Sequence, residues 1–128
     1  MSAQRALLLA ILIVAVLVGY FLVNFQSGSA LVDAVASGNL ESVNRLIEEG
    51  HDIDAFGKDD WTPLTTAVEN DDSDMVRFLL QNGADPNRIV PGGTALDMAI
   101  RRNRTGPAQV IREFGGHCKN VCDTEKEN

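Results

Sequence analysis

The chain has 128 residues and a formal net charge of −7, so it is long enough for one small domain. All 18 acidic residues follow position 32. Faces that bind nucleic acid or anionic lipid are rich in lysine and arginine, so this acidic balance argues against both kinds of partner.

The first predicted element is an apolar helix over residues 6–23, ALLLAILIVAVLVGYFLV, which contains no charged residue. As a helix it covers roughly 27 Å, close to the ~30 Å hydrocarbon core of a bilayer. We therefore expect a retained transmembrane anchor within residues 1–25. The alternative is a cleaved signal peptide and secretion, because SGSA at 27–30 offers a small-residue cleavage site.

The positive charges around this helix predict its orientation. Arg5 and the amino terminus precede it, and no lysine or arginine follows before Arg45. The positive-inside rule then puts the N-terminus in the cytoplasm and the rest of the chain in the periplasm or another extracytoplasmic space. Small-residue pairs, which favour weak self-association of membrane helices, also occur in the segment. They are Ala6 with Ala10, and Ala15 with Gly19.

Beyond the apolar helix, the sequence repeats with a period near 33. The three stretches begin SALVDAV at 29, WTPLTTAV at 61 and GTALDMAI at 93. The recurring positions are Leu31, Leu64 and Leu96; Ala34, Ala67 and Ala99; and Gly50, Gly83 and Gly115. A period of this length indicates stacked repeats of one supersecondary unit.

The middle unit predicts a pair of short helices, over 63–70 and 73–82. Thr62 is a suitable N-cap and Pro63 suits the first helical turn. The second helix carries an apolar stripe and ends at Gly83, a residue that favours the left-handed turn after a helix. One such pair cannot bury its apolar faces alone, so we expect stacked pairs with a stability of a few kcal/mol.

The motifs WTPLTTAV and FLLQNGADPN resemble those of the ankyrin repeat family, and the resemblance covers residues 29–117. It implies an all-α solenoid of about three units, 29–56, 57–89 and 90–117, with 118–128 as a C-terminal tail. The histidine usual in the family's turn motif is replaced by Val32, Thr65 and Asp97 in successive units. These replacements predict looser turns.

In this family, the fingers between repeats and the exposed face of the first helix of each repeat commonly contact protein partners. The resemblance carries that role to Lys58, Asp59, Trp61, Glu69, Asn70, Arg101 and Arg102. Two interpretations of Trp61 stay open, as a contact for a partner or as a packing residue between fingers. For the acidic segment 69–74 and the basic segment 101–104, mutual charge pairing is the alternative to partner binding.

Motifs for catalysis or for binding small ligands are lacking. The segment DIDAFGKDD at 52–60 resembles a calcium loop, but Phe56 and Pro63 occupy two of its ligand positions. No phosphate-binding loop and no catalytic triad is apparent. We therefore expect no enzyme activity, no cofactor and no metal. In an extracytoplasmic domain, Cys118 and Cys122 are expected to form a disulfide.

These observations predict a membrane-tethered protein–protein interaction module built of ankyrin repeats and exposed outside the cytoplasm. The alternative function is a specific inhibitor or immunity-type protein that blocks a partner enzyme through the repeat surface. Both assign the binding of another protein to the repeats.

Overall fold

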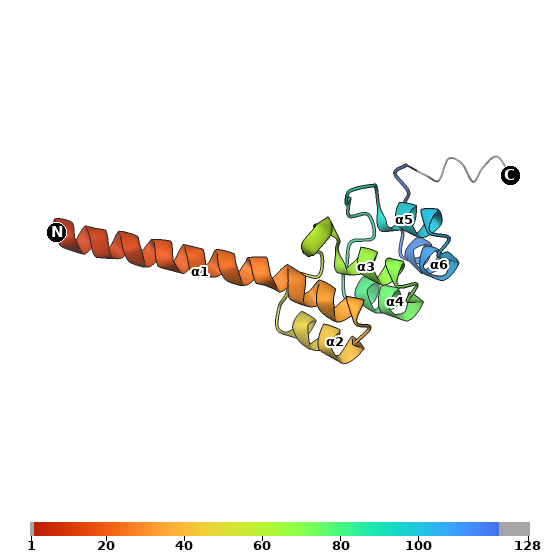
Figure 1. Cartoon of the computed structure of the whole chain (residues 1–128), viewed down its shortest axis with the longest axis horizontal. Coiled ribbons are helices and arrows are strands. Elements are labelled where there is room, and N and C mark those ends of the chain that lie inside the picture. The colour runs from red at the N-terminus through yellow and green to blue at the C-terminus, as the bar shows by residue number, and fades with distance from the viewer. Residues whose placement is uncertain (1, 121–128) are drawn as a thin grey trace.

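The computed structural model describes residues 2–120, with the backbone alone for 23–29. The end of one long helix pairs with a short helix, and two further pairs of short helices stack on that pair (Figure 1). The elements are α1 (Ala3–Ala36), α2 (Leu40–Glu48), η1 (Lys58–Asp60), α3 (Pro63–Glu69), α4 (Ser73–Gln81), α5 (Ala95–Arg101) and α6 (Thr105–Glu113).

Helix α1 combines the apolar segment with the first helix of the first repeat. Its stretch Ala3–Leu22 is long and apolar enough to cross a membrane, and none of it is buried within the protein. Its last turns are different, because Leu31, Ala34 and Val35 are buried against the repeats. The predicted boundary between the anchor and the repeat domain, between residues 25 and 29, therefore lies inside a continuous helix.

The three pairs stack with their first helices in one row and their second helices in another (Figure 1). α1 packs on α2 and α3, α3 packs on α4 and α5, and α6 packs on both α4 and α5. The apolar residues on the facing sides of these helices form one continuous core. The largest fully buried aliphatic side chains are Leu31, Leu79, Leu96 and Ile111, which come from all three repeats.

Helix starts follow the predicted caps. Thr62 and Thr65 form a reciprocal capping box at the start of α3, with Pro63 in the first turn. Thr94 and Asp97 form the equivalent box at α5. Thr65 and Asp97 stand where the family usually has histidine. In both turns the side chain of this residue accepts a hydrogen bond from the backbone N–H of the N-cap threonine, which closes the helix start. The expectation of looser turns is therefore wrong for the second and third repeats.

The core predicts the effect of truncating one leucine. Leu79→Ala should lower the free energy of unfolding by about 2–5 kcal/mol, because its side chain is fully buried between repeats. Urea unfolding of the full chain in detergent micelles, followed by circular dichroism, measures the change. Leu40→Ala, at an exposed position on α2, is the matched control and should cost far less. Equal stability of the Leu79 variant and the wild type would contradict the repeat register.

Candidate functional site

The stacked repeats present two opposite edges. One edge is formed by two loops between pairs, residues 51–61 and 84–93, called the finger loops below. The other edge is formed by the short turns within pairs, residues 37–39, 70–72 and 102–104, called the distal turns. Because α1 enters the domain from the apolar segment, the finger loops lie on the side of that segment and the distal turns on the far side (Figure 1).

The first finger loop carries three of the predicted binding residues. Lys58 and Asp59 are exposed in η1, and Asp59 has a left-handed backbone with φ of 65°. Trp61 lies at the base of the loop, where its carbonyl oxygen accepts a 2.8 Å hydrogen bond from the Gly57 N–H. Its side chain is half-buried and packs against the hydrophobic core. This contact supports the packing interpretation of Trp61 and leaves part of the ring accessible.

The first finger loop is also held tightly against α1. A Cβ atom added at Gly57 would lie 2.8 Å from Cγ2 of Val32. Real side chains do not approach so closely, so only glycine allows this contact. The loop is therefore fixed to the helix that carries the apolar segment.

The second finger loop closes as a small hairpin between Val90 and Gly93, which exchange backbone hydrogen bonds of 2.9 and 3.0 Å. Arg101 supports it from α5, because its Nη1 donates a 2.6 Å hydrogen bond to the carbonyl oxygen of Gly92. The predicted binding residue Arg101 is thus exposed but also braces the loop.

At the distal turns, side chains of one repeat bind the helix end of the preceding repeat. The Asn70 amide donates to the carbonyl oxygens of Val35 at 3.3 Å and Ala36 at 3.2 Å, at the end of α1. In the next repeat, Nη2 of Arg104 donates to the carbonyl oxygen of Glu69 at 3.0 Å. Carbonyl groups at helix ends lack α-helical partners, so these contacts supply donors to them and join each repeat to the one before it.

The acidic and basic segments meet at this same edge, as the charge-pairing alternative predicts. Arg102 lies 3.3 Å from Glu69, and Arg104 lies 3.8 Å from Asp71. Arg102 and Asp71 are more than half exposed, so each pair contributes under about 1 kcal/mol. The guanidinium of Arg102 therefore remains reachable from solvent.

A ladder of hydrogen bonds joins successive loops on the finger side. The Asp54 carboxylate accepts the Asp85 N–H at 3.0 Å. One repeat later, the Asn87 side-chain oxygen accepts the His117 N–H at 2.7 Å. Asp54 and Asn87 stand 33 residues apart and perform the same task, the first with a charge and the second without one.

The charge on Asp54 is unfavourable in the folded protein. Burial raises the pKa of its carboxyl above the ordinary 3.8, and repulsion from Asp85 and Asp52 acts in the same direction. The Asp85 N–H and the Arg88 guanidinium oppose this rise of the pKa without cancelling it. A raised pKa means that this carboxyl favours folding below its unfolded pKa, and that the contribution is lost as the pH rises through the folded pKa.

Asp54→Asn is therefore expected to raise the melting temperature at pH 7, because asparagine keeps the acceptor for Asp85 and removes the charge. The gain should disappear below about pH 3.8, where the wild-type carboxyl is protonated as well. Thermal melts of both proteins across pH 3–7 measure this. Asp59→Asn, at an exposed position, should show no such pH-dependent gain. A lower melting temperature for the Asp54 variant at pH 7 would contradict the inferred charge penalty.

Asp97 has a larger role than its place in the turn motif indicated. It is fully buried, and its carboxylate accepts the N–H groups of Thr94, Lys119 and Asn120, each at 2.9 Å. It therefore ties the segment that follows α6 to the start of α5. The sequence contains a signal for part of this role, because TALD at 94–97 fits the capping-box pattern. The bonds to Lys119 and Asn120 are long-range and have no such local signal.

Asp97→Asn is expected to lower the free energy of unfolding by about 1–3 kcal/mol, since its NH2 group would face backbone donors that now need an acceptor. Hydrogen exchange at the Lys119 and Asn120 amides should accelerate, and urea unfolding should report the loss of stability. Asp74→Asn, exposed in the first turn of α4, is the control. Unchanged exchange at Lys119 and Asn120 would show that Asp97 does not hold this segment.

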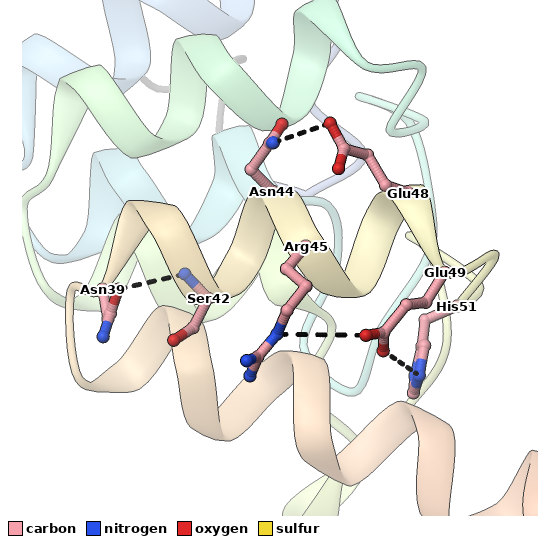
Figure 2. A network of polar contacts seen from close by, with 7 residues as sticks. All are labelled: Asn39, Ser42, Asn44, Arg45, Glu48, Glu49 and His51. Carbon is pink, nitrogen blue, oxygen red and sulfur yellow. Dashed lines mark hydrogen bonds and ion pairs between the residues drawn. The ribbon is translucent and has the colours of Figure 1, made fainter.

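The outer surface of α2 is occupied by polar side chains that pair with one another (Figure 2). Nearly all of these contacts join residues three or four positions apart, as on an ordinary solvated helix face. The pairs are Asn39 with the Ser42 N–H, Asn44 with Glu48, Arg45 with Glu49, and Glu49 with His51. This face therefore resembles a capping surface at the first repeat rather than a binding site.

Within residues 2–120, no three side chains of His, Cys, Asp or Glu are grouped so that they could hold a metal ion. In the segment 52–60, Asp52 and Asp54 accept backbone hydrogen bonds instead. Cys118 packs against the hydrophobic core. Cys122 lies outside the described residues, so its pairing with Cys118 stays a prediction.

Comparison with known proteins agrees with this geometry. A model of three ankyrin repeats matches residues 31–120. Similar proteins include the human mitochondrial disaggregase, at 41% identity over 59 residues, and the mouse protein phosphatase 1 regulatory subunit 27, at 44% over 57 residues. These matches cover 46% and 44% of this chain, but only 8% and 37% of the two relatives.

A solved structure is similar over a longer stretch. The crystal structure of the ankyrin repeat domain of Bcl-3 aligns with a TM-score of 0.65 and 37% sequence identity. The alignment covers 68% of this chain and 39% of that one. The mouse B-cell lymphoma 3 protein homolog is 42% identical over 81 residues, which are 62% of this chain and 18% of that protein.

Proposed function

The chain belongs to the ankyrin repeat family, and from this premise we propose that it is a protein-binding module anchored in a membrane by its own N-terminal helix. Ankyrin repeats are protein–protein interaction modules, typically without catalytic activity of their own. The proposal adds the anchor, the orientation and the residues that meet the partner.

The observation that carries the proposal is the double environment of α1. Its N-terminal part, Ala3–Leu22, exposes a continuous apolar surface that none of the described residues covers. Its C-terminal part is buried in the repeat core through Leu31 and Val35. An apolar helix of 20 residues matches the thickness of a bilayer core. A membrane would bury the apolar surface of the N-terminal part, while the repeats bury the apolar side chains of the C-terminal part.

Orientation follows from charge. Arg5 stands at the start of α1, whereas every acidic residue of the chain follows position 32, in the repeats and the C-terminal tail. The positive-inside rule favours Arg5 on the cytoplasmic side. We therefore place the repeats on the extracytoplasmic side, where a disulfide between Cys118 and Cys122 would also be stable.

The partner surface is assigned to the exposed polar groups of the finger loops and distal turns. Lys58 and Asp59 project from η1, and Arg102 remains more than half exposed despite its contact with Glu69. Trp61 adds an accessible part of an aromatic ring to the first finger loop. Charged and aromatic side chains on a rigid frame favour recognition of another folded protein.

A topology measurement combined with crosslinking tests this function. A reporter fused after Asn128 of the full chain should be active only outside the cytoplasm, and the protein should stay with membranes under carbonate wash. A photoreactive residue at position 58 or 102, introduced into the full chain in its native membranes, should crosslink to a protein. The same probe at position 41, on the outer face of α2, is the matched control and should crosslink at least tenfold less.

The outcomes separate the parts of the proposal. Reporter activity in the cytoplasm would overturn the orientation, and release by carbonate would overturn the anchor. Equal crosslinking from positions 41, 58 and 102 would overturn the assigned surface, even if the anchor and orientation hold.

A further inference from the structure

We propose that the finger loops rest on the lipid headgroup layer of the membrane that α1 spans, with Phe56 and Ile89 as the apolar contacts. This inference rests on the proposed membrane anchor. It adds a lipid contact through the apolar side chains of the finger loops, beside the polar groups of the same loops that are assigned above to a protein partner.

Exposed apolar side chains of the repeats lie mainly on the finger loops. Among the described residues beyond the apolar segment, three large hydrophobic side chains are exposed, Leu40 at 47%, Phe56 at 41% and Ile89 at 56%. Phe56 and Ile89 stand 33 positions apart, at equivalent places in the two finger loops. Leu40 is at the opposite edge, directly after a distal turn. The exposed apolar surface of the repeats is thus concentrated on the side of the apolar segment.

The first finger loop has a defined height along α1. Gly57 touches Val32 of α1, so the first finger loop is fixed at the level of that residue. Val32 lies seven residues beyond position 25, about 10 Å along an unbroken helix. The headgroup layer is about 5–8 Å thick on each side of a bilayer. An upright α1 holds the first finger loop a few ångströms above the headgroups, and a tilt of α1 towards that loop, of the ~20° common for membrane helices, would bring the loop nearer to them.

The finger loops combine an arginine–aromatic pair with several carboxylates. The Arg88 guanidinium lies over the Phe56 ring, 4.9 Å from its centroid. Aromatic rings and arginine side chains are the groups that anchor proteins at the membrane interface. The same loops carry five carboxylates, which repel anionic lipid. These are Asp52, Asp54, Asp59, Asp60 and Asp85. A zwitterionic headgroup, such as phosphatidylcholine, therefore fits the loops better than an anionic one.

Fluorescence quenching by lipid tests the contact. The full chain with Ile89→Trp is reconstituted into phosphatidylcholine vesicles whose acyl chains carry bromine near the glycerol end. The matched control is Leu40→Trp, which puts an exposed tryptophan at the opposite edge. Wild-type protein gives the background from Trp61, and circular dichroism confirms that each variant is folded.

The added tryptophan at position 89 should lose at least about half of its emission to the brominated lipid, while that at position 40 should lose little. Replacing part of the lipid with phosphatidylglycerol should reduce the quenching at position 89, and added salt should restore it. The restoration would identify repulsion from the loop carboxylates as the cause.

The outcomes distinguish this inference from the function beneath it. Failure of the protein to float with vesicles would overturn the membrane anchor and the lipid contact together. Flotation without quenching at position 89 would overturn the lipid contact alone and leave the proposed anchor and protein-binding surface in place. Equal quenching at positions 40 and 89 would contradict the orientation of the repeats over the bilayer.

Discussion

The two parts of helix α1 require different surroundings. Over Ala3–Leu22, α1 offers an apolar surface on every side, whereas over its last turns it offers a stripe to the core through Leu31, Ala34 and Val35. The first repeat depends on this second part, because α2 and α3 both pack on it. Without α1 in place, α2 would lose its main apolar partner and the stack would begin with an uncovered core.

Polar side chains, in addition to the apolar core, help to fix the position of each repeat on the next. On the distal edge, Asn70 and Arg104 donate hydrogen bonds to carbonyl groups at the end of the preceding first helix. On the finger edge, Asp54 and Asn87 bind the N–H groups of the following loop. The same arrangement, a polar side chain of one repeat bonded to a backbone group of a neighbouring repeat, thus appears twice on each edge.

The sequence predicted the repeat fold well because its signals are local and periodic. Thr62 before Pro63, together with Gly83 after the apolar stripe, was enough to place α3 and α4 to within one residue. The candidate surface was less predictable. The sequence left two interpretations of Trp61 open, and its partial packing on the core depends on tertiary contacts that no local pattern encodes. The bonds from Asp97 to Lys119 and Asn120 depend on how the chain returns to the stack, which no local pattern encodes.

The unbroken course of α1 also sets an angular phase between the apolar segment and the repeats. Each residue of a helix turns the chain by about 100° and advances it by about 1.5 Å. A single residue inserted between positions 25 and 29 would therefore rotate the whole repeat stack by more than a quarter turn about the axis of α1. With α1 in a membrane as proposed, the finger loops would then point in a different direction within the plane of that membrane. In this architecture the number of residues in α1 would set the direction in which the finger loops point. Neighbours would then be selected by direction as well as by chemistry.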